Sequence, residues 1–159
     1  MDKPSLLSEI VSAITFALNN SLAAAEEARE TATNKENAAE NKYDTLGLEA
    51  AYLAHGQSER VLQLEKDLAA YVSLADRLSD HTIAGVGSLL QLESDSGDIR
   101  FLFIGPASGG LVVNIDGVAV TVITPESPLG KSLLGAGSND EVTTSVAGGS
   151  AKACITNLW

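Results

Sequence analysis

Apolar residues in the first half of the chain recur at alternating spacings of four and three. One such run consists of Leu7, Val11, Ile14, Leu18, Ala25, Ala28, Ala32 and Ala39, with Ser21 and Lys35 as interruptions. A second run consists of Gly47, Ala50, Ala54, Gln57, Val61, Leu64, Leu68, Tyr71, Ala75 and Leu78. This spacing is typical of helices that pack along a heptad seam. Two runs of similar length with a break between them predict an antiparallel helical hairpin, a coiled coil, with its tip near residues 41–45.

The second half of the chain reads as short strands separated by turn signals. The expected strands are 88–93, 100–104, 111–115, 118–123, 141–146 and 151–158. Asp116-Gly117 between two apolar runs is a strong signal for a tight β-hairpin. Ser127, Pro128 and Gly135 have the order of an N-cap, a first helical residue and a C-terminal glycine, so they predict one short helix between strands. The fold class is therefore α+β, with a helical hairpin followed by a small domain of one twisted sheet and one short helix.

Glycine marks the boundary between the two halves. Twelve of the 14 glycines follow residue 80, and glycine punctuates turns. We therefore expect two domains, a coiled-coil hairpin at 1–80 and a sheet domain at 81–159.

Charge and cysteine content exclude several function classes. The net charge of −11 argues against direct binding to a nucleic acid backbone, because Lys and Arg supply most of that affinity. The single cysteine, Cys154, allows no internal disulfide and favours a reducing compartment. The sequence shows neither a signal peptide pattern nor an uninterrupted apolar run long enough to span a bilayer. We expect a cytoplasmic protein that binds no membrane and is too small for a large enzyme.

Candidate chemistry concentrates at the expected tip of the hairpin. Glu36, Glu40 and Asp44 recur every four residues there. Such a series is equally typical of a solvated helix face and of carboxylates that present oxygen ligands to Mg²⁺. A projecting tip cannot enclose a metal alone, but it can complete a site inside another macromolecule. His55 and His81 have no neighbouring cysteine and are not expected to bind metal.

Two stretches of the sequence resemble a known family. The run from Thr124 to Gly135, followed by Asn139-Asp140-Glu141-Val142, resembles the C-terminal signature of Gre-type transcript cleavage factors, the GreA/GreB family. Residues 41–44, 48–51, 56 and 59–61 resemble the tip and the returning helix of that family's coiled coil.

The resemblance implies an FKBP-like C-terminal domain and a bacterial RNA polymerase partner. Factors of this family insert their coiled coil through the secondary channel of the polymerase. Two tip acids then help to hold a second Mg²⁺, and the polymerase cleaves its own backtracked RNA. On this reading the chain is not itself an enzyme, has no cofactor of its own, shares Mg²⁺ with the polymerase and meets nucleic acid only inside that complex. We expect a monomer.

Carried over by residue, the family's tip Glu falls on Asp44 and its tip Asp falls on Asn41. Asn41 is an amide, which is a weaker ligand for a hard cation and cannot act as a base. Glu40 lies one position earlier and is the substitute if the bend is shifted by one residue. The candidate catalytic residues are therefore Asp44, Asn41 and Glu40, and the candidate metal ligands in trans are Asp44 and Glu40. An alternative register places Glu36 at the tip.

Three functions remain open from the sequence. The first is a transcription elongation factor that stimulates cleavage of backtracked RNA. The second is a regulator that binds the secondary channel without stimulating cleavage, which the Asn41 departure favours. The third is a role without polymerase, as a coiled-coil adaptor or a prolyl isomerase. The loop at 105–110 is the expected docking segment of the second domain.

Overall fold

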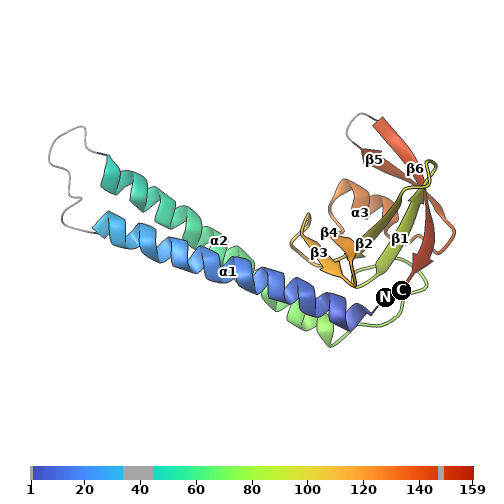
Figure 1. The fold of residues 1–159 in the computed structure, drawn as a ribbon, viewed down its shortest axis with the longest axis horizontal. Helices are drawn as coiled ribbons and strands as arrows, with labels where there is room; N and C mark the ends of the chain where they lie inside the picture. Colours follow the sequence, from blue (N-terminus) through green and yellow to red (C-terminus); the bar gives the residue numbers. More distant parts are fainter. Residues whose placement is uncertain (1, 34–44, 147–148) are drawn as a thin grey trace. The chain divides into compact units, whose positions relative to one another are not determined.

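The structure is a computed structural model that describes residues 2–33, 45–146 and 149–159. The chain forms two long helices, α1 (Lys3–Thr33) and α2 (Leu46–Ala75), followed by a six-stranded sheet with one short helix (Figure 1). The predicted α+β class is confirmed. The strands are β1 (Leu89–Ser94), β2 (Ile99–Ile104), β3 (Val112–Ile115), β4 (Val118–Ile123), β5 (Glu141–Val146) and β6 (Gly149–Leu158), with α3 (Pro128–Leu133) between β4 and β5.

The chain divides into two compact units that do not coincide with the helices. One unit contains residues 1–12 and 69–159, and the other contains residues 13–68. Each long helix therefore contributes residues to both units. The predicted boundary between residues 80 and 81 stays a prediction.

The seam predicted from the spacing of four and three is the buried side of the two helices. Among its described positions, all except Ala75 are buried or half-buried. Ala75 is the last residue of α2, and Leu78 lies beyond that helix, so the predicted seam extends too far at this end. Leu6 and Ile10 are fully buried although they lie outside the seam, because this end of α1 belongs to the same compact unit as the sheet.

The sheet has the strand order β3-β4-β2-β1-β6-β5. All its neighbouring strands are antiparallel except β2 and β4, which run parallel. Asp116 and Gly117 both have positive φ, at 52° and 79°, as the two-residue turn between β3 and β4 requires. The positive φ explains why the turn uses Gly117, since a side chain there would strain the backbone.

Side chains on the two faces of the sheet are buried in different clusters. One cluster lies under α3 and consists of Ala84, Leu90, Leu92, Leu102, Ile104, Ile123, Leu133, Val142, Ala153 and Ile155. Leu89 of β1 is paired with Phe103 of β2. Because successive side chains of a strand point to opposite faces, these two residues lie on the face opposite to that cluster, and both are fully buried. Tyr71 of α2 is fully buried on this second face, so the sheet is covered on both sides.

Helix α1 is apolar as well as long. Among the described helices it alone has the length and composition to cross a membrane, with a mean hydropathy of 1.3 over 18 residues, of which 22% are buried. A helix from the core of a soluble protein meets the same criterion, so this is weak evidence for a membrane span. The expectation that the protein binds no membrane stays a prediction.

Candidate functional site

The residues predicted to carry the chemistry lie outside the described part of the chain. Glu36, Glu40, Asn41 and Asp44 all fall within residues 34–44. The structure therefore does not test their roles as catalytic residues or metal ligands. Elsewhere, among the described residues, no group of three or more His, Cys, Asp or Glu side chains is arranged to hold a metal.

Helix α2 begins at Leu46, immediately after the predicted tip. The carbonyl oxygen of Thr45 accepts the first helical hydrogen bond, from the Glu49 amide at 2.9 Å. The Thr45 hydroxyl also donates to Oε1 of Glu49 at 2.8 Å. Thr45 thus bonds to the first turn of α2 through both its carbonyl oxygen and its hydroxyl. The start of the returning helix is thus fixed next to the candidate acids.

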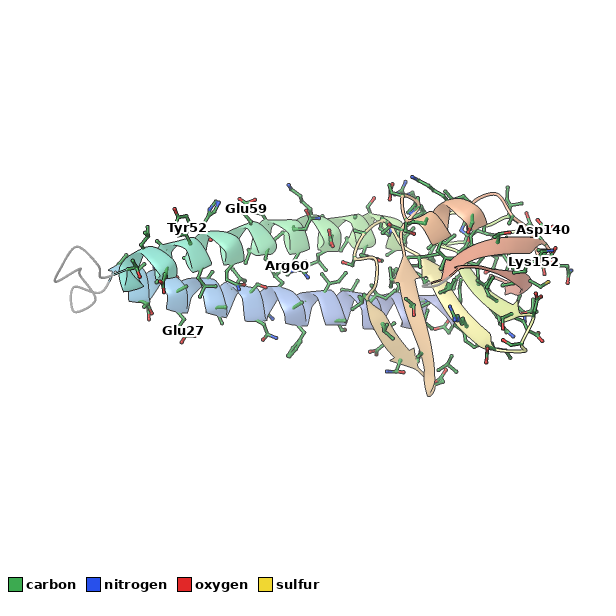
Figure 2. The ribbon with its side chains drawn as sticks, turned by 90° about the horizontal axis from the view of Figure 1, so that it is seen from above. Glu27, Tyr52, Glu59, Arg60, Asp140 and Lys152 are labelled. Carbon is green, nitrogen blue, oxygen red and sulfur yellow. The ribbon has the colours of Figure 1, made fainter. Side chains whose placement is uncertain are left out.

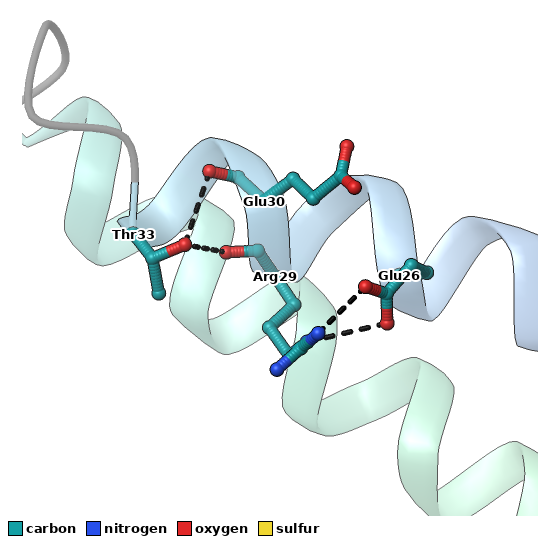
Figure 3. A network of polar contacts seen from close by, with 4 residues as sticks. All are labelled: Glu26, Arg29, Glu30 and Thr33. Carbon is teal, nitrogen blue, oxygen red and sulfur yellow. Dashed lines mark hydrogen bonds and ion pairs between the residues drawn. The ribbon is translucent and has the colours of Figure 1, made fainter.

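Helix α1 ends on the other side of the predicted tip with a small polar network (Figure 3). The Arg29 guanidinium donates to both carboxylate oxygens of Glu26, at 2.6 and 3.2 Å. Thr33 donates to the carbonyl oxygens of Arg29 and Glu30 at 2.9 and 3.3 Å. The hydrogen bonds and the charge of Arg29 lower the pKa of Glu26, so this carboxylate stays ionised at neutral pH. Because the Glu26 and Arg29 side chains are mostly exposed, at 55% and 68%, their ion pair adds little stability.

The stretch that resembles the Gre signature forms a strand end, a capped helix, a turn and a second strand. Ser127 Oγ accepts a hydrogen bond from the Gly130 amide at 3.0 Å, which confirms the predicted N-cap of α3. Gly130 is buried against the backbone, where a Cβ atom would lie 1.9 Å from the carbonyl oxygen of Thr124. Only glycine fits there, a constraint that sequence reasoning missed because it arises from a contact between the helix and the preceding turn.

The second part of that signature is also fixed by hydrogen bonds. Asp140 Oδ2 accepts from the Gly137 amide at 2.7 Å, and Asn139 has a positive φ of 71°. Lys152 pairs with Glu141 at 3.1 Å across β5 and β6; Figure 2 labels Asp140 and Lys152 in this region. The signature residues therefore have structural roles in this domain. Their presence is direct evidence for its fold.

The loop at 105–110, predicted to be a docking segment, is held against α2. The hydroxyl of Tyr71 donates to the carbonyl oxygen of Ala107 at 2.8 Å. A Cβ atom on Gly105 would lie 2.2 Å from that hydroxyl oxygen. The Gly105 amide donates to the carbonyl oxygen of Ile123, and the Gly110 amide donates to that of Val122. The loop has a defined conformation, while its role in docking stays a prediction.

The other residues singled out from the sequence have ordinary surroundings. His55 is exposed on α2, and His81 is half-buried beside Lys3 and the end of α2. Cys154 is half-buried in β6. Phe103 is fully buried in the core, whereas Phe101 and Trp159 are half-buried.

Comparison with known proteins gives only distant structural likenesses. No protein-family model matches the chain, and no curated protein does. GreA factor homolog 1 (Gfh1) of Thermus thermophilus is 18% identical over 94% of both chains, with a TM-score of 0.39. Gfh1 of Thermus aquaticus is 18% identical over 92% of both chains, also with a TM-score of 0.39. A prokaryotic transcription elongation factor GreA/GreB from Nitrosomonas europaea is 22% identical over 48% of this chain and 60% of its own, with a TM-score of 0.38. Identities and scores this low do not by themselves assign a family.

Proposed function

We propose that the chain is a transcription factor that binds bacterial RNA polymerase and presents the end of its helical hairpin in the secondary channel. The observation that carries the proposal is the Gre-like signature at 124–142. Its residues form, in this order, a strand end, a capped helix, a glycine turn and a second strand. Ser127 is the N-cap of the helix, and Gly130 packs where a side chain would not fit. The long helix pair that precedes this domain supports the same proposal.

In the form we favour, the factor stimulates cleavage of backtracked RNA. Asp44 supplies a carboxylate ligand to an Mg²⁺ ion that the polymerase active site already holds in part, and Glu40 or Asn41 orients the attacking water. Mg²⁺ is normally bound by one or two carboxylates together with waters and substrate phosphate oxygens, so a single added carboxylate is a useful contribution. The two metal ions stabilise the attacking and leaving oxygens of phosphodiester hydrolysis. The factor has no enzymatic activity of its own under this proposal and acts as a cytoplasmic monomer.

A cleavage assay on stalled, backtracked polymerase complexes tests this function. We expect the wild-type chain to shorten the RNA, Asp44→Ala to abolish the effect, and Asn41→Asp to increase it. Glu59→Gln is the matched control, because Glu59 is an exposed carboxylate of α2 outside the tip. Unchanged RNA length with the wild-type chain, in complexes that a known cleavage factor does shorten, would rule out the cleavage function.

Asn41 favours the second candidate, a factor that occupies the channel without stimulating cleavage. Such a factor would bind core polymerase and compete with a cleavage-competent factor. The assay for it is inhibition of that factor's activity as the concentration of this chain rises. Loss of inhibition on removal of residues 34–44 is expected, since the tip must enter the channel to block it.

A further inference from the structure

A groove lies between α1 and α2, next to the helix ends that flank residues 34–44. It has a volume of about 400 Å³ and lies within the compact unit of residues 13–68. Its lining residues are Ala24, Glu27, Ala28, Thr31, Glu49, Ala50 and Leu53. The lining is mostly apolar, with one carboxylate from each helix. Figure 2 labels Glu27 on α1 and Tyr52 on α2 at this end of the helix pair.

The groove exists because the seam residues here are small. Ala28 and Ala50 are 5% and 8% exposed, so the two helices do meet at this level. Leu53 lies one turn after Ala50 on the same side of α2, yet it is 55% exposed. Leu53 lies just outside the seam, and it forms one wall of the groove above the alanine floor. An exposed leucine beside the seam is a surface that gains free energy when an apolar group covers it.

The charges around the groove restrict what can cover it. Glu49 lies between Thr45, whose hydroxyl fixes Oε1 of its carboxylate, and the exposed Leu53 one turn later. Glu27 lines the groove from α1, and the neighbouring cation, Arg29, is already paired with Glu26. An anionic or nucleic acid ligand would be repelled. A purely apolar ligand would not use the charge of Glu49, which is exposed at the edge of the groove and has no ion pair with another described residue.

We propose that this groove receives an arginine side chain from the surface of RNA polymerase. An arginine has an aliphatic stem that suits the alanine and leucine floor and a guanidinium that suits the carboxylate of Glu49. Tyr52 is 71% exposed and adjacent to Leu53, so its ring is available to stack on the planar guanidinium. A lysine ammonium is more strongly hydrated and makes neither the planar stack nor the bidentate pair. The inference rests on the proposed function, because it names a contact that the polymerase makes with the inserted hairpin.

The test uses the full chain and purified core polymerase. A photo-reactive amino acid in place of Leu53 should cross-link to a polymerase segment that contains an arginine, identified by mass spectrometry. Leu53→Lys should weaken binding at least tenfold, because it places a cation where the guanidinium binds. Leu62→Lys is the matched control, since Leu62 is 50% exposed on α2 but lies outside the groove.

A second measurement tests the charge of Glu49 without changing the size of its side chain. Glu49→Gln keeps the shape of the side chain and should weaken polymerase binding by about two- to fivefold, the range of one exposed charge pair. The salt dependence of binding should fall as well, because a screened ion pair is lost. Glu65→Gln, an exposed acid of α2 outside the groove, should change neither.

The outcomes separate this inference from the proposed function. If the wild-type chain does not bind polymerase, the proposed function fails and the inference fails with it. If the wild-type chain binds but Leu53→Lys and Glu49→Gln bind equally well, the groove is not the contact and the proposed function stands. A cross-link from position 53 to a segment without arginine would also overturn the inference and leave the function intact.

Discussion

The contact between Tyr71 and Gly105 gives the sharpest prediction about this fold. Tyr71 is fully buried, and its hydroxyl donates to the Ala107 carbonyl oxygen at 2.8 Å. A Cβ atom on Gly105 would lie 2.2 Å from that hydroxyl oxygen and 3.0 Å from Cγ1 of Val122. Gly105 does not have a positive φ, so its backbone suits alanine and the obstacle is steric alone.

The magnitudes follow from these distances. Tyr71→Phe loses one buried hydrogen bond, and we expect the free energy of unfolding to fall by about 1–2 kcal/mol. Gly105→Ala forces the ring or the loop to move by roughly an ångström, at a cost of about 2–3 kcal/mol. In the double variant the hydroxyl oxygen is gone and the nearest ring atom, Cζ, lies 3.1 Å from the new Cβ. The double variant should therefore be more stable than the sum of the single variants predicts, by about 1–2 kcal/mol.

Urea denaturation followed by the fluorescence of Trp159 measures these differences. Trp159 is the single tryptophan and belongs to the same compact unit as Tyr71, where its amide donates to the Leu89 carbonyl oxygen. Gly85→Ala is the matched control, because nothing lies within 4 Å of a Cβ atom at Gly85. Strict additivity of the two single variants, or a Gly105→Ala protein as stable as Gly85→Ala, would refute the reasoning.

Three further predictions concern pH, a helix cap and an exposed ion pair. Burial, followed by the charge of Lys3, lowers the pKa of His81 below its ordinary value of 6.5, so the unfolded chain binds a proton more readily. The free energy of unfolding should therefore decrease as the pH falls below about 6.5. In urea denaturation at a series of pH values, His81→Gln should remove this decrease, whereas His55→Gln should not. Ser127→Ala removes the N-cap of α3 and should cost about 1 kcal/mol in the tryptophan assay, whereas Ser127→Asn should restore most of it. Glu26→Gln breaks an exposed pair with Arg29, and circular dichroism melting should show no change; a clear loss of helix would contradict our estimate of that pair.

The helices and strands were predictable because local patterns determine them. The bounds of β4 and β5 coincide with the predicted ranges, and the other strands differ by one or two residues at one or both ends. The seam could be predicted from spacing alone, since a helix side that packs must repeat every three or four residues. Ser127 and the Asp116-Gly117 turn carry recognisable local chemistry, and both have the predicted role.

Contacts between distant residues could not be predicted in the same way. The parallel pairing of β2 with β4 depends on which strands meet, and no local pattern encodes it. Tyr71 reads as an ordinary seam residue, although its hydroxyl reaches a loop 36 residues away. Gly105 and Gly130 read as flexible residues, although their surroundings leave no space for a side chain. The groove beside Leu53 follows from the small seam residues, but its size depends on how closely the two helices approach.

The place of β6 in the sheet has a consequence for synthesis of the chain. β6 follows the other five described strands in the sequence, yet it lies between β1 and β5, and Figure 1 shows it in that position. Until residue 158 has left the ribosome, β1 presents an unpaired edge that includes the apolar residues Leu90 and Leu92. Unpaired apolar edges of nascent sheets invite aggregation. The sheet is therefore expected to close only after β6 has been made, and until then the nascent chain should depend on chaperones that shield β1.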